Sequence, residues 1–347
     1  MQQSDQSQLV LSNLRQPAFF AEDGIITAVN SAASQRFAKV GMEIRELIVT
    51  GKEEYEALCS GSLYLTICLE QTQYPCHITA MQNKQLFIMQ EDTARAELQS
   101  LALAAQQLNM PVSEISLLVE RLSNIDGEEK AKISKNLFRL RRILGNMADA
   151  AQLTVSAPRL TSCEMCALFQ EILEKAGELL SQNGTKLVYK LPNHYVHSTA
   201  SAELLRRAVY NLISNAVKFS PAGKPVEAVL SHNGKRLAFS VTSCCDDGFD
   251  PGNLFNRYTR QPGLEDPRLG LGLGMTLIHA AATAHGGTVL VEKLPGRKLR
   301  ITMSLPIRED KTGDIRSPIL IPDIYSGSDQ ALIELSDVLP YQLYNEF

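Results

Sequence analysis

The stretch Asn211-Leu-Ile-Ser-Asn215-Ala-Val-Lys218-Phe-Ser-Pro221 carries the most informative spacing in the chain. Its two asparagines are four residues apart, so both side chains fall on one face of a helix. An amide oxygen can bind a hard cation such as Mg²⁺, and the lysine three residues further on can reach a phosphate. The stretch therefore predicts a helix with one face suited to a metal ion and to phosphate groups.

A glycine-rich run, Gly270-Leu-Gly272-Leu-Gly274, follows later in the chain and opens an apolar helix that ends at His285. Glycine amides at a helix N-terminus can form a cradle for phosphate. Either motif alone is a weak signal, but in this order and spacing they resemble the ATP-binding domain of sensor histidine kinases. The resemblance implies the α/β sandwich fold shared with gyrase and Hsp90-type ATPases, here over residues 157–308.

The resemblance also implies which residues bind the nucleotide, with ATP and Mg²⁺ as the cofactors. By this resemblance Asn215 is the Mg²⁺ ligand, Asn211 supports the ion or the phosphates, and Lys218 reaches a phosphate. Arg260 lies in a stretch similar to the family's lid-side aromatic and arginine motif, which places it near the γ-phosphate. The implied ATP-binding residues are Asn211, Asn215, Lys218, Asp246, Gly248, Arg260, Gly270, Gly272 and Gly274. The alternative for the two asparagines is helix capping or a plain solvent-exposed position.

The adenine contact departs from the family's pattern. The family uses a strand-end Asp-x-Gly-x-Gly, whose aspartate accepts a hydrogen bond from the adenine amino group. Strand register places Ser243 at that position, whereas an insertion of three residues would let Asp246 serve with Gly248, with Asp250 in place of the second glycine. A buried bond of this kind contributes on the order of 1.5–3 kcal/mol, so ATP binding should weaken roughly ten- to a hundredfold if Asp246 cannot reach.

Regular elements can be placed in this region from the hydrophobic pattern. Besides the helix that ends at His285, two helices and five strands are expected. They are Ser162–Leu180 and Ala202–Phe219 for the helices, and Lys186–Leu191, Val226–Leu230, Leu237–Thr242, Thr288–Glu292 and Leu299–Leu305 for the strands.

Residues 1–90 predict a small α+β domain. Short strands are expected at Ala18–Phe20 and Ile25–Val29, and Asn30 is expected to cap the helix that follows. Three more strand candidates complete the order, at residues 62–70, 75–81 and 86–89. This order resembles a PAS sensor domain, which implies a signal-receiving role.

Residues 91–156 predict a helical hairpin. Apolar residues keep a strict 3-4 spacing before and after a break at Asn124-Ile-Asp-Gly127. The seam consists of Ala94, Leu98, Leu101, Ala105, Leu108, Val112, Ile115, Val119 and Leu122 in the first helix, and of Ile133, Leu137, Leu140, Leu144, Met147 and Ala151 in the second. One hairpin is too thin to bury both seams, so two copies are expected to form a four-helix bundle as a homodimer. Pro111 should kink the first helix.

The hairpin resembles the dimerisation hairpin of histidine kinases, but it lacks their chemistry. In that family a phosphorylated histidine stands five residues before the proline and is followed by an acidic residue. Gln106 and Gln107 take these places, and Met110 replaces the Thr or Asn that many members use in dephosphorylation. A carboxamide is a poor nucleophile and a poor base, so self-phosphorylation here looks lost.

Composition excludes several classes of protein. A net charge of -4 and a pI of about 5.9 argue against a nucleic-acid partner. No apolar run is long enough for a membrane span, and no signal peptide opens the sequence, so a cytoplasmic location is expected. Seven cysteines, an odd number, agree with a reducing compartment. Cys163, Cys166, Cys244 and Cys245 could form a metal site, although buried apolar positions are the better interpretation.

The last residues, 309–347, form an acidic C-terminal tail without a counterpart in the family. Residues 331–339 could form a short amphipathic helix, and either a docking peptide or a loosely packed end is possible. The whole chain is thus expected to be an α+β multidomain protein, with a PAS-like domain, a hairpin in a dimeric four-helix bundle, an α/β sandwich ATP-binding domain and this tail.

Three functions fit these features. The first is a degenerate histidine kinase that binds ATP and Mg²⁺, does not phosphorylate itself, and regulates a partner kinase or response regulator. The second is an active kinase that phosphorylates a partner's histidine in trans. The third is a non-enzymatic interaction module with a relic nucleotide site.

Overall fold

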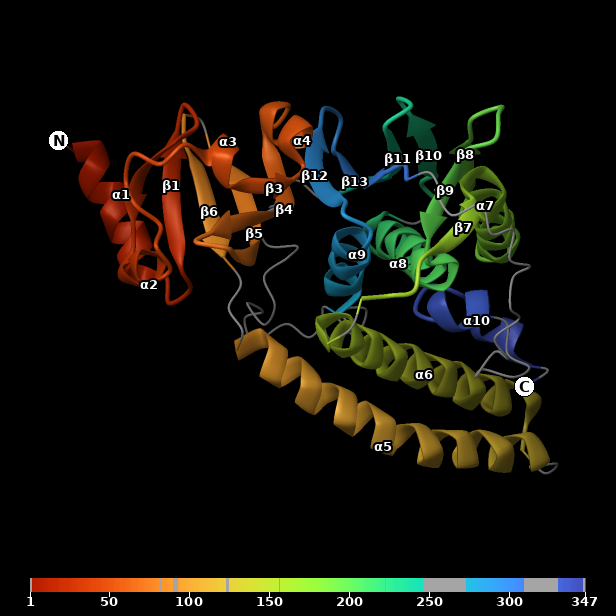
Figure 1. Ribbon diagram of the computed structural model, residues 1–347. Helices are drawn as coiled ribbons and strands as arrows, with labels where there is room; N and C mark the ends of the chain where they lie inside the picture. Colours follow the sequence, from red (N-terminus) through yellow and green to blue (C-terminus); the bar gives the residue numbers. More distant parts are fainter. Residues whose placement is uncertain are drawn as a thin grey trace.

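The computed structural model describes residues 2–81, 83–89, 93–122, 125–155, 157–221, 223–245, 273–308, 330–345 and 347. Figure 1 shows an N-terminal α+β unit at one end and a larger α/β unit beside it. A long helical hairpin lies along the α/β unit, with its second helix nearer to that unit. None of the helices among these described residues is long and apolar enough to cross a membrane.

The N-terminal unit is an antiparallel sheet with short helices. Its elements are α1 (Gln2–Asn13), β1 (Ala18–Glu22), β2 (Ile25–Val29), α2 (Ser31–Gln35), α3 (Ile44–Leu47), β3 (Ile48–Thr50), α4 (Lys52–Glu56), β4 (Gly61–Leu69), β5 (Thr72–Ala80) and β6 (Gln85–Met89). The strands lie in the order β2-β1-β6-β5-β4, with β3 paired to β4. The predicted strands are therefore present, and one further short strand, β3, extends the set.

The expected cap at Asn30 is confirmed. Its Oδ1 accepts hydrogen bonds from the backbone N–H of Ala33 at 2.8 Å and of Ala18 at 3.0 Å, so one side chain joins helix and strand. The sequence predicts this helix over Ala32–Val40, but it ends at Gln35, because Phe37 adopts a positive φ of 67° that an α-helix does not accommodate.

The hairpin consists of α5 (Thr93–Arg121) and α6 (Gly127–Val155). Three seam residues of α5, spaced seven positions apart, are buried against α6. They are Ala105, Val112 and Val119, and they form one cluster with Leu137, Leu144 and Met147 of α6. The alternate seam residues Leu108, Ile115 and Leu122 are 45–49% exposed. A single chain therefore buries half of the described α5 seam. The helix continues through Pro111 to Arg121.

The α/β unit contains one mixed sheet covered by helices. Its elements are β7 (Thr161–Glu164), α7 (Met165–Ser181), β8 (Leu187–Lys190), β9 (His197–Ala200), α8 (Ala202–Phe219), β10 (Val226–His232), β11 (Arg236–Cys244), α9 (Leu273–Ala284), β12 (Thr288–Leu294) and β13 (Lys298–Pro306). The strand order β12-β13-β11-β10-β8 has one parallel pair, β10 with β8.

Two predictions in this unit were wrong in detail. Residues 162–164 belong to strand β7 rather than to the following helix, because they pair with β9. Strand β9 itself was not predicted, since its sequence His197-Ser-Thr-Ala200 has little apolar character.

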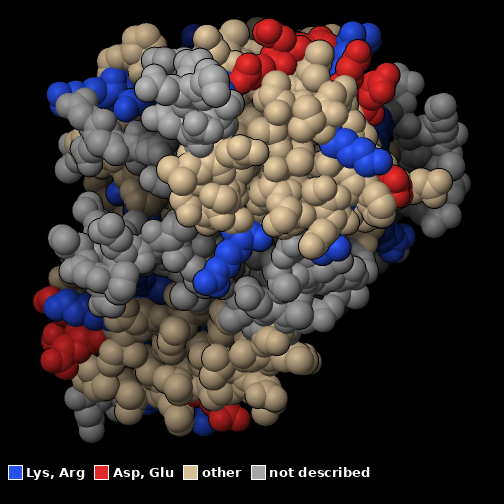
Figure 2. Space-filling view, turned by 90° about the vertical axis from the view of Figure 1, so that its left-hand side faces the viewer, with Lys and Arg blue, Asp and Glu red and all other residues tan. Residues whose placement is uncertain are grey.

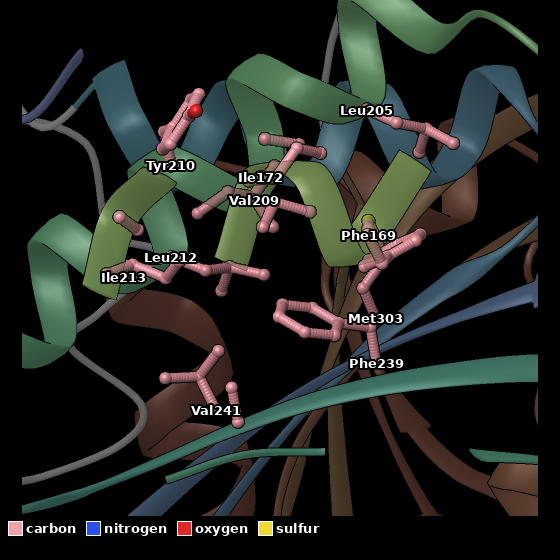
Figure 3. Close-up of a cluster of buried hydrophobic side chains, with 14 of the residues drawn as sticks. Phe169, Ile172, Leu205, Val209, Tyr210, Leu212, Ile213, Phe239, Val241 and Met303 are labelled. Atoms are coloured by element: carbon pink, nitrogen blue, oxygen red, sulfur yellow. The ribbon is translucent and has the colours of Figure 1, made fainter. Parts of the chain in front are cut away.

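The core of this unit lies between α7, α8 and the sheet. Figure 3 shows Phe169 and Ile172 of α7 close to Leu205 and Val209 of α8, above Phe239 of β11. The rings of Phe169 and Phe239 lie 4.9 Å apart between centroids. This packing fixes α8 against the sheet, so the residues on its opposite face are held in defined positions.

The two sheets are joined edge to edge, which was not predicted. Strand β12 pairs with β4 through Val289↔Tyr64, Leu290↔Leu63 and Val291↔Ser62. This three-pair ladder, which we call the sheet junction, makes one continuous sheet.

Side chains reinforce the sheet junction. The Tyr64 ring stacks on His77 at 4.7 Å between centroids and meets His279 of α9 at 4.4 Å. Glu54 of α4 accepts from Arg236 at 2.6 Å and from Ser304 at 2.8 Å. The N-terminal unit is thus bonded to both the sheet and α9.

The tail segment, residues 330–347, is packed rather than loose. It contains α10 (Gln330–Glu334) and the 3-10 helix η2 (Tyr341–Tyr344). Leu335 and Tyr344 are fully buried, and the Tyr344 ring meets Phe138 of α6 at 5.0 Å between centroids. The helix expected over residues 331–339 is present only as far as Glu334, whereas the alternative of a loosely packed end is wrong for these residues.

Charges of both signs are spread over the surface of the N-terminal end of the molecule. Figure 2 shows lysine, arginine, aspartate and glutamate side chains among mostly uncharged residues on the described part of this face.

Within the described residues no group of three or more His, Cys, Asp and Glu side chains could hold a metal ion. The four cysteines Cys163, Cys166, Cys244 and Cys245 are free thiols and do not form such a site.

His285, at the end of α9, is buried and must be neutral to keep its hydrogen bonds. Its Nε2 accepts from the backbone N–H of Ser201 at 2.9 Å, so Nδ1 carries the proton and donates to the carbonyl of Ala281 at 2.7 Å. Burial lowers the pKa of His285, and the nearby charge of Arg308 lowers it further.

Acid should therefore destabilise the fold through His285. The unfolded chain takes up a proton near the ordinary histidine pKa, and the folded chain does so only at lower pH. The free energy of unfolding should therefore decrease as the pH is lowered from about 6.5. Urea unfolding across this range should show a shallower pH slope in His285→Asn than in the parent. His197→Asn, which removes an exposed histidine, is the control. Equal slopes in His285→Asn and the parent would contradict this assignment.

Candidate nucleotide site

Helix α8 presents the two asparagines and the lysine as its sequence predicts. The Ser201 hydroxyl caps its start by accepting from the N–H of Leu204 at 3.4 Å, and the helix ends at Phe219, two residues before Pro221. Asn211 is fully buried, and Asn215 is half-buried. The Lys218 side chain is 7% exposed.

The first turn of α9 packs directly on these asparagines. A Cβ added to Gly274 would lie 3.1 Å from Oδ1 of Asn211 and 3.7 Å from Nδ2 of Asn215. The Asn215 amide also donates to the sulfur of Met275 at 3.6 Å. A side chain at 274 would therefore have to displace the Asn211 amide by a few tenths of an ångström.

The structure thus brings together four of the nine candidate residues, Asn211, Asn215, Lys218 and Gly274. The other five, Asp246, Gly248, Arg260, Gly270 and Gly272, lie outside the described residues. At the end of β11, Phe239, Val241 and Ser243 are all buried, so the strand register that places Ser243 at the end of this inward face is confirmed.

The amide of Asn211 is completely engaged by the chain itself. Its Oδ1 accepts from Arg142 of α6 at 3.0 Å and from Asn146 at 3.5 Å. Its Nδ2 donates to the carbonyl of Arg207 at 3.0 Å and to Glu334 of the tail segment at 3.1 Å. A side chain expected to face a nucleotide therefore contacts the hairpin and the tail segment instead.

Asn211 lies within a cluster of buried charges that we call the ion cluster. It comprises Arg139, Arg142 and Asp149 of α6, Arg207 and Lys218 of α8, and Glu334 and Asp337 of the tail segment. The cluster joins three segments that are far apart in the sequence.

Two carboxylates of the tail segment bind the cations of this cluster. Glu334 contacts Arg207 at 3.0 Å. Asp337 contacts Arg142 at 2.7 Å, Arg139 at 3.0 Å and Lys218 at 3.1 Å. Lys218, expected to reach a phosphate, is thereby paired with a carboxylate.

The cluster shifts the protonation of its acids in opposite directions. Burial alone raises the pKa of Asp337, but Arg142 and Lys218 outweigh it and hold that pKa below its usual range. Burial raises the pKa of Asp149 to about 6 despite the lowering effect of Arg207. Asp337 therefore stays ionised at neutral pH.

The ion cluster was not predicted from the sequence. The acidic excess of the last residues and the basic residues of α6 are visible in the sequence, but their pairing depends on where the tail segment docks.

On the hairpin, Gln106 and Gln107 are exposed on α5, and Met110 is 71% exposed. Among the described residues, no side chain of the ion cluster contacts Gln106, Gln107 or Met110.

Comparison with known proteins supports the nucleotide-binding fold. Residues 200–309 match the family described as histidine kinase-, DNA gyrase B-, and HSP90-like ATPase. The adaptive-response sensory kinase SasA of Crocosphaera subtropica is 29% identical over 237 residues, which covers 60% of this chain and 59% of that protein. The chain is thus similar to sensor histidine kinases, and the matching ATPase domain spans residues 200–309.

Further sensor histidine kinases are similar to this chain to comparable extents. The sensor-like histidine kinase SenX3 of Mycobacterium tuberculosis is 26% identical over 266 residues, covering 71% of this chain and 64% of that protein. The solved structure of full-length ShkA in complex with AMPPNP has a TM-score of 0.47 and 20% identity, covering 61% of this chain and 46% of that one. This histidine kinase-like chain spans about three fifths of the length of the first curated relatives that it matches.

Proposed function

We propose that this chain is a nucleotide-binding signalling protein of the histidine kinase type that does not phosphorylate its own hairpin. Its nucleotide is ATP with Mg²⁺, bound where α8 meets the start of α9. The observation that carries this proposal is that two separate motifs lie side by side: a Cβ added to Gly274 of the glycine-rich run would lie 3.1 Å from Asn211 and 3.7 Å from Asn215. In this proposal Asn215 binds the Mg²⁺ ion and Lys218 a phosphate.

The loss of self-phosphorylation rests on helix α5. Gln106 and Gln107 are exposed where the family resemblance places a histidine and its acidic partner. The six histidines of the chain are His77, His194, His197, His232, His279 and His285, so the hairpin has none. An exposed carboxamide has neither the nucleophilicity nor the basicity for phosphoryl transfer.

The remaining parts of the proposal follow from the other units. Residues 1–90 act as a PAS-like sensor in the cytoplasm, and residues 91–156 form a homodimer. The exposed alternate seam of Leu108, Ile115 and Leu122 supports dimerisation, because a second hairpin would bury it. The output is a conformation read by a partner kinase or a response regulator rather than by nucleic acid.

The full chain should bind nucleotide and yet carry no phosphohistidine. Calorimetry with Mg²⁺ and a non-hydrolysable ATP analogue is expected to show binding, which Asn215→Ala weakens at least about tenfold. Labelled ATP is expected to leave no acid-labile phosphate on the chain. Gln170→Ala removes an exposed amide on α7, outside the site, and should bind like the parent.

The outcomes separate this proposal from its alternatives. Acid-labile label on the hairpin would contradict the loss of self-phosphorylation. Label that appears on the histidine of an added partner, and disappears with Asn215→Ala, would establish a kinase acting in trans. No binding at millimolar analogue would indicate a non-enzymatic module with a relic site.

A further inference from the structure

The tail segment places its two acidic side chains on residues that the proposed function assigns to the nucleotide. Glu334 accepts a hydrogen bond from the Asn211 amide at 3.1 Å, and Asp337 binds Lys218 at 3.1 Å. A carboxylate and a phosphate oxygen make the same kinds of contact, since both accept from amide N–H groups and pair with ammonium and guanidinium groups. The tail segment thus offers anionic oxygens where phosphate oxygens would bind.

These contacts engage the ammonium group of Lys218 and part of the guanidinium group of Arg142. Lys218 is buried against Asp337, and Arg142 donates to Asn211 and contacts Asp337 at 2.7 Å. A triphosphate that reached Lys218 would bring further negative charge next to Asp337. Two anions at one cation repel each other, so the carboxylate and the phosphate cannot share Lys218 in this buried place.

The tail segment is anchored by a surface separate from these donors. Tyr344 is fully buried against Phe138 of α6, and its hydroxyl donates to the carbonyl of Leu332 at 2.8 Å. Ser134 donates to the carbonyl of Phe347 at 2.7 Å, and Asn183 donates to that of Val338 at 2.8 Å. The docking of the segment can therefore be weakened without touching a residue assigned to the nucleotide.

We propose that the tail segment is a tethered competitor of the nucleotide, with the carboxylates of Glu334 and Asp337 in place of its phosphates. The inference rests on the proposed function, because it concerns the regulation of that same site. It assigns the α6–α8 surface as a binding site for an acidic peptide, which in this structure is the chain's own. ATP binding and tail docking exclude each other, so the nucleotide gains access when the tail segment leaves.

Releasing the tail segment should strengthen nucleotide binding. If the segment is docked in about nine of ten molecules, the apparent Kd is about tenfold above its intrinsic value, and release removes that factor. Full-length Tyr344→Ala, which weakens the anchor, and Asp337→Asn, which keeps the shape and removes the charge, are both expected to bind the Mg²⁺–ATP analogue about tenfold more tightly. Tyr341→Ala is the matched control, because Tyr341 lies in the same 3-10 helix and contacts Lys132 and Glu128 of α6 instead of a residue assigned to the nucleotide.

A second readout uses the unmodified protein. Hydrogen exchange of the backbone amides in residues 331–344 should accelerate when the Mg²⁺–ATP analogue is added, because displaced helices lose their protection. This measurement supports the inference independently of whether Tyr344→Ala folds.

The results also distinguish failure of the inference from failure of the proposed function. Equal affinities in the parent, Tyr344→Ala and Asp337→Asn, with unchanged exchange, overturn competition but leave nucleotide binding standing. Binding by the variants and not by the parent supports competition. No binding by any of these proteins at millimolar analogue overturns both.

Discussion

Arg207→Ala is expected to lower the free energy of unfolding by roughly 3–5 kcal/mol, the cost of leaving buried charge unpaired. The Arg207 guanidinium lies between Glu334, which is 2% exposed, and Asp149 of α6. Without it, two carboxylates would face each other in a buried place with one cation fewer. The change should be measured by urea unfolding at neutral pH.

The neighbouring residue supplies a matched control. Arg206 also forms an ion pair on α8, with Glu171 at 2.8 Å, but that carboxylate is 66% exposed. Exposed pairs contribute at most about 1 kcal/mol, so Arg206→Ala should be nearly neutral. A similar loss in both variants would show that burial of the ion cluster is not what makes Arg207 important.

The pH dependence gives a further check on Arg207. In Arg207→Ala, protonation of Glu334 and Asp149 would remove their unpaired charge. The difference in unfolding free energy between this variant and the parent should therefore become smaller as the pH is lowered. The double variant Arg207→Ala with Glu334→Gln should recover part of the loss at neutral pH. A difference that is constant with pH would contradict an electrostatic origin.

Gly61→Ala is expected to open the sheet junction. Gly61 has a φ of 94°, and an added Cβ would lie 2.2 Å from the carbonyl oxygen of Val291 on β12. Because the obstacle is backbone rather than a flexible side chain, no rotamer change can relieve it. The start of β4 must move away from β12, and the pairs from Val291↔Ser62 to Val289↔Tyr64 should be lost.

The expected result is separation of the two units without loss of either fold. Amides of β12 and β4 at the junction should exchange faster, and thermal unfolding should split into two transitions. Gly296→Ala is the control, since Gly296 also has a positive φ of 79° but has no atom within 4 Å of an added Cβ. It carries the backbone penalty of about 1–2 kcal/mol without the clash. If both variants behave alike, the junction does not depend on close approach at Gly61.

Much of the local structure follows from short-range signals. Helix α8 has the predicted limits, because Ser201 caps its start, Pro221 lies just beyond its end, and its apolar residues keep helical spacing between them. The strands of the mixed sheet also fall where the sequence alternates. The meeting of Gly274 with the two asparagines was implied only by the family resemblance.

What could not be predicted depends on contacts between distant segments. The sheet junction is made by backbone groups at two strand edges, and such pairing leaves no characteristic side chains. The ion cluster needs Arg142, Arg207 and Asp337 from three segments, each of which alone reads as an ordinary solvated charge. Strand β9 forms only because β7 lies beside it.

The sheet junction also limits how the two units can influence each other. Side chains of a strand alternate between faces, so a one-residue slide of β4 along β12 would turn the Tyr64 ring away from His279 to the opposite face. Small displacements are therefore resisted by the hydrogen bonds, and intermediate registers lose both the ladder and the ring contact. We therefore expect the N-terminal unit to be either coupled to the α/β unit through the sheet junction or uncoupled from it, with no intermediate register.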